Sequence, residues 1–193
     1  MDFEMVPSDL RHIKLIPYAT LMDRPNDIPN YPGVYLFFLN GGGRMWEVTA
    51  YYEMETRRPF SLGVMTHVYT GSAMNLRERL KQHLGTTIEN SSIRKTLLSL
   101  EQIFGALSGS DTPACKVKGQ KTLTAWLREN AIVGYEYHRD PVRRENQILK
   151  RHASPFNIAM RRGRPYARAL SEWRCKAFPA SAGRKPGRRL RSM

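Results

Sequence analysis

Residues 67–84 read His-Val-Tyr-Thr-Gly-Ser-Ala-Met-Asn-Leu-Arg-Glu-Arg-Leu-Lys-Gln-His-Leu, an order typical of a strand end, a glycine turn and a helix. Tyr69 favours a pleated strand, and Gly71 permits a turn at a point where a side chain would clash. Either Ser72 or Asn75 can cap the helix by accepting a hydrogen bond from its first amides. The stretch therefore predicts a strand–turn–helix unit.

Two cations share one face of that helix. Arg79 and His83 are four residues apart, beside an apolar stripe of Leu76, Leu80 and Leu84 that would fix the helix to a core. The unit thus brings a strand tyrosine, an arginine and a histidine within reach of one small volume. Taken singly, each of the three is more often structural, because aromatic residues fit sheets well and helix cations are usually solvated.

The charge of the chain is concentrated at one end. The 193 residues carry a net charge of +14, and from residue 161 onward eleven Lys and Arg face a single Glu. Such a segment attracts polyanions by releasing their condensed counterions. Nucleic acid is therefore the leading partner, an anionic membrane surface the second, and a solvated tail without a specific role the third.

Other classes of protein find little support in the composition. No run approaches the roughly 18 apolar residues that span a bilayer, and the first residues lack the cationic flank and apolar core of a secretory signal. Cys115 and Cys175 are far apart and outside any Cys/His cluster with ligand spacing, so neither a zinc site nor a disulfide framework is indicated. We expect a cytoplasmic protein of one substantial domain that does not enter membranes.

The strand signals predict a small sheet. Residues 1–30 contain four prolines, which prevent a long regular element and indicate an N-terminal arm. Residues 33–39 form the first clear strand, 45–54 can return after a glycine-rich turn, and a third strand ends at Tyr69. These segments predict an antiparallel sheet of three strands, which residues 132–137 would join as a late member.

Three further helices follow from local signals. Apolar residues recur at steps of three and four between residues 92 and 107, and a short helix is indicated around 123–127. Asp140-Pro141 is a strong start for a helix that runs to about His152, because Asp caps free amides and proline suits the first turn.

Glu145 lies on the same side of that last helix as the apolar residues Val142 and Leu149. Burial raises the pKa of a carboxylate that has no partner, so a cation or a metal ion is the expected companion. The alternative is a simple bridge to Arg144 or Arg151.

Several of these residues recur in a known order. Read along the chain, they are Gly33-Val34-Tyr35, Tyr69-Thr70-Gly71, Arg79, His83, Glu145 and Asn157. They resemble the ordered motifs of the GIY-YIG nuclease superfamily, the catalytic module of phage homing endonucleases, of the excision-repair incision enzyme and of some restriction enzymes. The resemblance implies an α/β (α+β) nuclease fold with a small, mostly antiparallel three-stranded sheet flanked by helices.

The resemblance also implies a domain plan. A catalytic domain would cover residues 31–160, after the arm and before a basic extension over 161–193. Insertions at about 40–66 and 86–135 make the motif spacing longer than in minimal members, and they are large enough to help select the substrate.

The chemistry expected from the resemblance is metal-dependent hydrolysis of a phosphodiester. Glu145 would hold one Mg²⁺ or Mn²⁺ per active site, with waters in the other coordination positions. Arg79 would make a bidentate contact with phosphate oxygens. Tyr35 is the expected base or water-orienting group, and a nearby arginine and metal would lower its pKa from about 10.

The remaining site residues support that reaction. Tyr69 would orient water or phosphate, and His83 would relay a proton or donate a hydrogen bond. Asn157 would position Glu145 or the scissile phosphate. We expect nucleic-acid contacts from Arg77, Arg161, Arg162, Arg164, Arg168, Arg184, Lys185, Arg188 and Arg189.

The sequence leaves the biological role open. A restriction or defence endonuclease acting on duplex DNA is preferred, because the insertions are large enough to recognise a site. The alternatives are a homing or mobile-element endonuclease, a structure-selective repair nuclease and, from another class, a nucleic-acid-binding protein without catalysis. Cutting both strands with one active site needs either a homodimer or two successive nicks.

Overall fold

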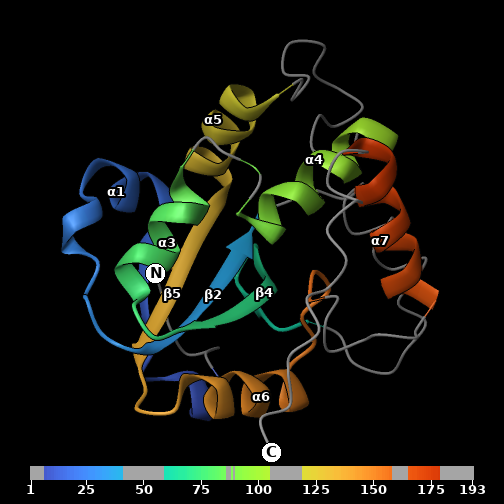
Figure 1. Cartoon of the computed structure of the whole chain (residues 1–193). Coiled ribbons are helices and arrows are strands. Elements are labelled where there is room, and N and C mark those ends of the chain that lie inside the picture. Colours follow the sequence, from blue (N-terminus) through green and yellow to red (C-terminus); the bar gives the residue numbers. More distant parts are fainter. Residues whose placement is uncertain are drawn as a thin grey trace, which may run out of the picture.

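A computed structural model describes the parts of the chain that carry the predicted motifs (Figure 1). The described residues are 7–40, 59–85, 88, 90–104, 119–157 and 165–178. The expected strand at 45–54 lies outside them, as does the expected helix end at 105–107.

One antiparallel sheet of five strands forms the centre of the molecule. The strands are β1 (Lys14–Pro17), β2 (Gly33–Leu39), β3 (Ser61–Leu62), β4 (Met65–Ala73) and β5 (Ala131–Tyr137), in the order β1-β5-β2-β4-β3. The antiparallel arrangement is confirmed, and the prediction of three strands is wrong. The late strand β5 pairs along the whole of β2, and this leaves its other edge free for β1, which comes from the expected N-terminal arm.

The central strand β2 explains why both faces of the sheet are covered. All seven of its residues are buried. Because side chains alternate along a strand, Tyr35 and Phe37 enter the larger apolar core on one face, while Val34 and Leu36 enter a smaller core on the other.

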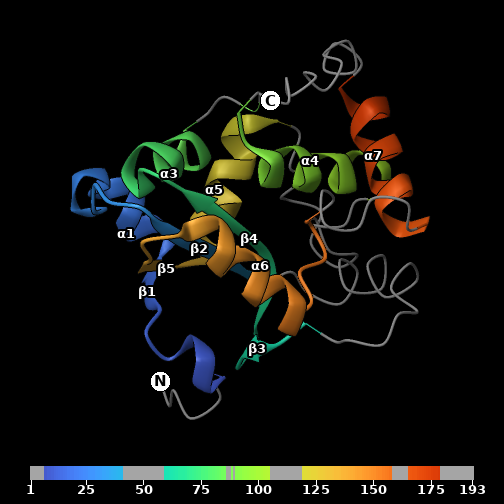
Figure 2. The same cartoon turned by 60° about the horizontal axis from the view of Figure 1, so that its bottom comes forward.

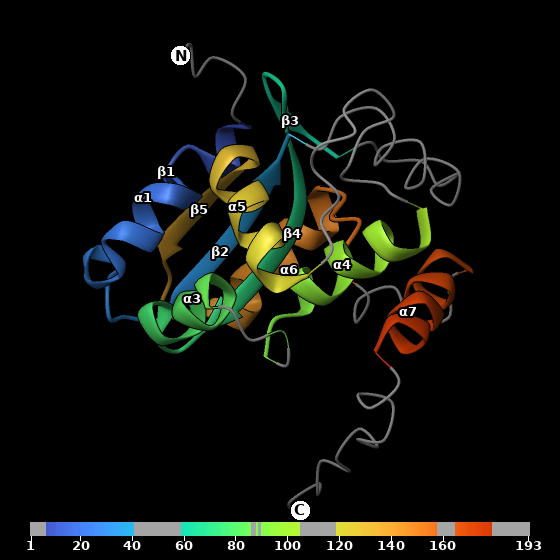
Figure 3. The same cartoon turned by 90° about the horizontal axis from the view of Figure 1, so that it is seen from above.

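The helices divide between the two faces (Figures 2 and 3). On the larger core lie α1 (Tyr18–Asp23), α3 (Leu76–Leu84), α4 (Ser92–Phe104) and α5 (Gln120–Asn130). On the smaller core lie the 3-10 turn η1 (Ser8–Leu10) and α6 (Pro141–Arg151). A second turn, η2 (Pro25–Asp27), precedes β2.

Both predicted helix starts are confirmed by their caps. Asn75 accepts from the backbone N–H of Glu78 at 3.1 Å at the start of α3, and Asp140 accepts from Arg143 N–H at 3.0 Å at the start of α6. Ser72, the alternative cap for α3, donates a hydrogen bond to Glu145 instead. The two helices therefore begin where local hydrogen bonding dictates.

A last helix, α7 (Pro165–Ala177), lies within the segment expected to be a basic extension. It runs beside α4 in Figures 1 and 2, and its Leu170 and Trp173 belong to the larger core. Arg174 fixes it to α4 by donating to Thr96 and to the Ser92 carbonyl. Across the described residues, no helix is long and apolar enough to cross a membrane.

Candidate active site

A buried tyrosine on β2 lies at the centre of the site. The Tyr35 hydroxyl accepts a hydrogen bond from Arg79 Nε at 3.1 Å and lies 2.9 Å from His83 Nε2. Arg79 and His83 both come from α3, one turn apart, as their spacing predicted. The strand–turn–helix unit thus brings Arg79 and His83 to the tyrosine of the neighbouring strand β2.

Burial controls the ionisation of Tyr35 and His83. It raises the pKa of Tyr35 well above the ordinary value, and the nearby Arg79 charge opposes this without reversing it. The expected fall in the pKa of Tyr35 is therefore not found here. Burial, with Arg79 and Arg94 nearby, lowers the pKa of His83 to about 3. At neutral pH the site holds a neutral phenol and a neutral imidazole.

The second nitrogen of His83 also has a partner. His83 Nδ1 lies 2.8 Å from the hydroxyl of the fully buried Ser91. A neutral imidazole carries one N–H, so a partner that accepts a hydrogen bond from one ring nitrogen leaves the other nitrogen as an acceptor. Ser91 and Tyr35 are thus linked through the ring of His83.

Tyr69 lines the same space from β4. Its ring centroid lies 6.2 Å from that of Tyr35 and 6.1 Å from that of His83. Burial lowers the pKa of Arg79, but the Tyr35 and Tyr69 hydroxyls beside it outweigh this and raise the value. Arg79 therefore stays positively charged beside the hydroxyl groups of Tyr35 and Tyr69.

Gly71 makes room for this arrangement. Any Cβ on Gly71 would overlap the Tyr35 hydroxyl and ring. Gly71, the glycine of the second motif, is therefore needed because it leaves space for Tyr35, the tyrosine of the first motif.

Glu145 approaches the site from the other side of β4. It accepts a short hydrogen bond from Ser72 Oγ, and burial raises its pKa, although Ser72 and the charge of Arg79 act in the opposite direction. The bridges weighed as alternatives are made by other residues, since Arg144 pairs with Glu136 and Arg151 with Asp9. Glu145 is left with Ser72 as its hydrogen-bond partner and close enough to Arg79 for that charge to act on its pKa.

The donor set around Glu145 fits one hard divalent cation. The described residues hold no cluster of three or more His, Cys, Asp and Glu side chains. Mg²⁺ keeps much of its hydration and commonly takes one or two carboxylates, with waters and substrate phosphate oxygens in the other positions. A single half-buried carboxylate with one oxygen engaged by Ser72 is compatible with that pattern.

Asn157 clamps the backbone of β4. Its Oδ1 accepts from Thr70 N–H at 2.9 Å, and its Nδ2 donates to the Thr70 carbonyl at 2.6 Å. Phe156 N–H adds a bond to the Val68 carbonyl. The Asn157 amide thus makes the two backbone hydrogen bonds at Thr70 that a neighbouring strand would make. Ser72, and not Asn157, holds the carboxylate of Glu145.

The predicted nucleic-acid contacts are divided. Arg77 is partly buried and donates to the Ile28 carbonyl at 2.7 Å, which ties α3 to the segment before β2. Arg168 is exposed on α7. The others lie outside the described residues: Arg161, Arg162, Arg164, Arg184, Lys185, Arg188 and Arg189.

Sequence reasoning missed the contacts of four polar residues that hold the site together, including Ser72, which it considered only as a helix cap. The four are His67, Ser72, Ser91 and Arg94; Ser91 contacts His83 eight positions away, and the other three make contacts more than 70 positions away. Arg94 is fully buried and binds the Tyr18 hydroxyl, Gln120 and Thr124. The only local signal was a charged or hydroxyl residue on the apolar side of its element.

Comparison with known proteins gives one match. A family model described as the GIY-YIG catalytic domain matches residues 33–176, which include all six predicted catalytic residues. No curated protein and no solved structure matches the chain.

Proposed function

Because the chain belongs to the GIY-YIG family of endonucleases, we propose that it hydrolyses phosphodiester bonds of duplex DNA with the help of one divalent metal ion. The observation that carries this is the hydrogen-bonded group of Tyr35, Arg79 and His83, with Glu145 across the strand and within reach of the Arg79 charge. This arrangement supports a site that combines a proton-accepting system, a fixed cation and a carboxylate able to bind a metal ion.

Tyr35 activates the attacking water. Its hydroxyl is protonated at neutral pH, so it can accept a proton from water only while passing its own to His83 Nε2, 2.9 Å away. This requires the His83 hydrogen on Nδ1, where Ser91 Oγ accepts it. The negative charge of a bound phosphate favours a protonated imidazole, which couples the transfer to substrate binding.

Arg79 stabilises the charge that develops on the phosphate. Its Nε holds Tyr35, and its Nη1 is anchored on Gln82 and on the Asn90 carbonyl at 2.7 and 3.2 Å. A guanidinium fixed in this way needs little reorganisation in the transition state. Tyr69 orients the water or phosphate from the adjacent strand.

Glu145 is the residue that would hold the ion. A bound Mg²⁺ or Mn²⁺ would polarise the phosphate and stabilise the leaving oxygen. Ser72 fixes one carboxylate oxygen, and Asn157 fixes the strand to which Ser72 belongs. These contacts keep the carboxylate at a set place relative to Arg79.

Cleavage of supercoiled plasmid DNA in Mg²⁺, with binding measured in EDTA, tests this function. Tyr35→Phe and Glu145→Ala should each lower the cleavage rate by about a hundredfold or more and leave binding within about threefold. Tyr137→Phe and Glu129→Ala are matched controls on exposed residues, and both should cut like the parent. Unchanged cleavage by Glu145→Ala would overturn the metal assignment.

The preferred biological role is restriction or defence. The support is that the matched region contains long segments between its motifs, which can contact bases around the scissile bond. Cleavage at a fixed sequence would agree with this role, whereas a preference for junctions or lesions would favour repair. Light scattering of the DNA-bound protein distinguishes a homodimer from a monomer that nicks each strand in turn.

A further inference from the structure

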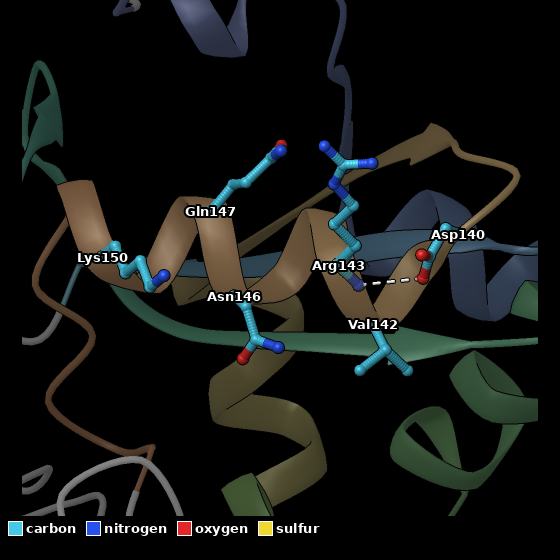
Figure 4. A pocket seen from close by; sticks show the side chains of 6 residues that line it. All are labelled: Asp140, Val142, Arg143, Asn146, Gln147 and Lys150. Carbon is cyan, nitrogen blue, oxygen red and sulfur yellow. Dashed lines mark hydrogen bonds between the residues drawn. The ribbon is translucent and has the colours of Figure 1, made fainter.

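The helix that carries Glu145 has a second face with its own chemistry. Figure 4 shows six side chains that line a hollow along the outside of α6. They are Asp140, Val142, Arg143, Asn146, Gln147 and Lys150. These residues form what we call the α6 outer face.

The side chains of the α6 outer face belong to the types that recognise bases. Arginine pairs with guanine, and asparagine and glutamine pair with adenine, through two hydrogen bonds at the major-groove edge. Within the described residues, the side chains of Arg143, Asn146 and Gln147 make no hydrogen bond to the protein. Val142 is 59% exposed although the sequence placed it on the apolar stripe, and a small apolar side chain suits a thymine methyl group.

Charge on this face matches a polyanion. Arg143 and Lys150 are exposed cations, and the carboxylate of Asp140 is turned to the helix start, where it accepts from Arg143 N–H. Arg151, also in the last turn, pairs with Asp9. The outer face therefore presents positive charge with its only carboxylate engaged in the helix cap.

The position of Glu145 on the helix fits a helix lying in a groove. At about 100° per residue, Glu145 lies about 100° around the axis from Asn146 and about 160° from Arg143. Arg143 and Asn146 are three residues apart and so lie about 60° apart around the axis, and in Figure 4 their side chains diverge from the same exposed side of α6. A helix whose outer face meets the groove floor thus turns Glu145 away from the bases and toward β4, where its carboxylate contacts Ser72. Base contacts and the carboxylate therefore use different sides of α6.

We propose that α6 lies in the major groove of duplex DNA, with Arg143 and Asn146 contacting base edges while Glu145 points away from the bases toward β4. The inference rests on the proposed function and deepens it by assigning base recognition to the same helix. An α-helix with its side chains is about 10–12 Å wide, and the major groove is about 12 Å wide.

Binding selection from a duplex library with a random core tests the base contacts. The full chain, held in Ca²⁺ and separately in EDTA, should enrich particular bases, and Arg143→Ala and Asn146→Ala should each relax the preference at one position by about tenfold. Lys14→Ala, on the opposite edge strand β1, should leave the selected bases unchanged.

Purine analogues then test the groove. Replacing the selected purine by its 7-deaza form removes a major-groove acceptor, so it should weaken binding by the parent about tenfold and leave binding by the variant without the matching side chain unaffected. No enrichment, enrichment unchanged in both variants, or insensitivity to 7-deaza purines would each overturn the proposal. Plasmid cleavage without any base preference would overturn it while leaving the proposed nuclease function in place. Absence of plasmid cleavage by a parent protein that still selects particular bases would overturn the nuclease function and leave the base contacts of α6 in place.

Discussion

The ring of His83 has a hydrogen-bond partner at each nitrogen, and the one at Nδ1 is a serine outside the recognised motifs. If Ser91 accepts the Nδ1 hydrogen, Nε2 is free to receive the Tyr35 proton. Ser91 is then a positioning residue that acts through His83. In the serine-protease triad, loss of the group that sets the histidine tautomer costs far more rate than binding.

Ser91→Ala should therefore lower kcat about tenfold or more with little change in KM, because the ring loses its fixed tautomer while the phosphate contacts remain. Ser91→Thr keeps a hydroxyl at the same place and should restore most of the rate. Initial rates on a short duplex, measured between pH 6 and 9, give both parameters. A kcat for the alanine variant equal to that of the parent would remove Ser91 from the mechanism.

A second buried histidine makes stability depend on pH. His67 is fully buried, its Nδ1 hydrogen bonds the Ala153 carbonyl at 3.1 Å, and its Nε2 accepts from Thr70 Oγ1 at 2.8 Å. Burial lowers the pKa of His67 from 6.5 to about 3. Between these values the unfolded chain binds the proton and the folded chain does not, so the free energy of unfolding falls as the pH falls below about 6.5.

The prediction is a slope. His67 should contribute about 1.4 kcal/mol of lost stability per pH unit below about 6.5 and nothing above it. His67→Gln does not titrate, so the difference between its free energy of unfolding and that of the parent should narrow as the pH is lowered from 6.5 to 5. Urea denaturation at four pH values measures this, and parallel curves would contradict it.

At the scale of elements, the two motif glycines have different duties. A Cβ on Gly33 would overlap the Glu136 carbonyl oxygen of β5, a backbone atom that cannot move without disturbing the sheet. A Cβ on Gly71 would meet the Tyr35 side chain. One glycine permits strand pairing, and the other permits the Tyr35 side chain to lie against β4.

Alanine substitutions should separate the two duties. Gly33→Ala should destabilise the protein by about 1–3 kcal/mol, because the central sheet must shift. Gly71→Ala should lower the cleavage rate, because Tyr35 is displaced, and should reduce the free energy of unfolding less than Gly33→Ala does. Urea denaturation and plasmid cleavage measure both effects, with Gly119→Ala as a control whose Cβ meets nothing within 4 Å. A Gly71→Ala protein that cuts like the parent would refute the spatial argument.

Elements with strong local signals could be predicted, and those decided by distant contacts could not. The starts of α3 and α6 follow from their cap residues, and β2 follows from a continuous apolar run. β1 has only four residues, the last of them Pro17, and becomes a strand only because it pairs with β5. Val142 has the right spacing for a core residue but is 59% exposed, because the sheet meets α6 through Ile148.

The candidate site shows the same division. Arg79 and His83 could be placed on one face by their spacing alone. Their meeting with Tyr35 depends on the pairing of β2 with β4, which aligns Tyr35 with Gly71. The sequence could place Asn157 near the site, but its contact with the backbone of Thr70 could not be predicted, because it joins residues 87 positions apart.

At the scale of the whole molecule, charge is distributed unevenly with respect to the site. The net charge is +14, and the eleven Lys and Arg after residue 160 carry most of it. Arg174 of this set is engaged with α4, so it helps to fold α7. The cations beyond residue 178 lie outside the described residues, and their contribution to DNA binding is measured by removing them.

Deleting residues 179–193 removes Arg184, Lys185, Arg188, Arg189 and Arg191. If these cations neutralise phosphates, the truncated protein should bind duplex DNA more weakly, and the slope of log K against log salt should become shallower by about 0.9 for each phosphate that is no longer neutralised. A full-length variant with the five cations changed to glutamine should reproduce the shallower slope, which separates charge from chain length. A slope equal to that of the parent would mean that residues 1–178 supply all the phosphate contacts, and the α6 outer face would then be the first surface to neutralise.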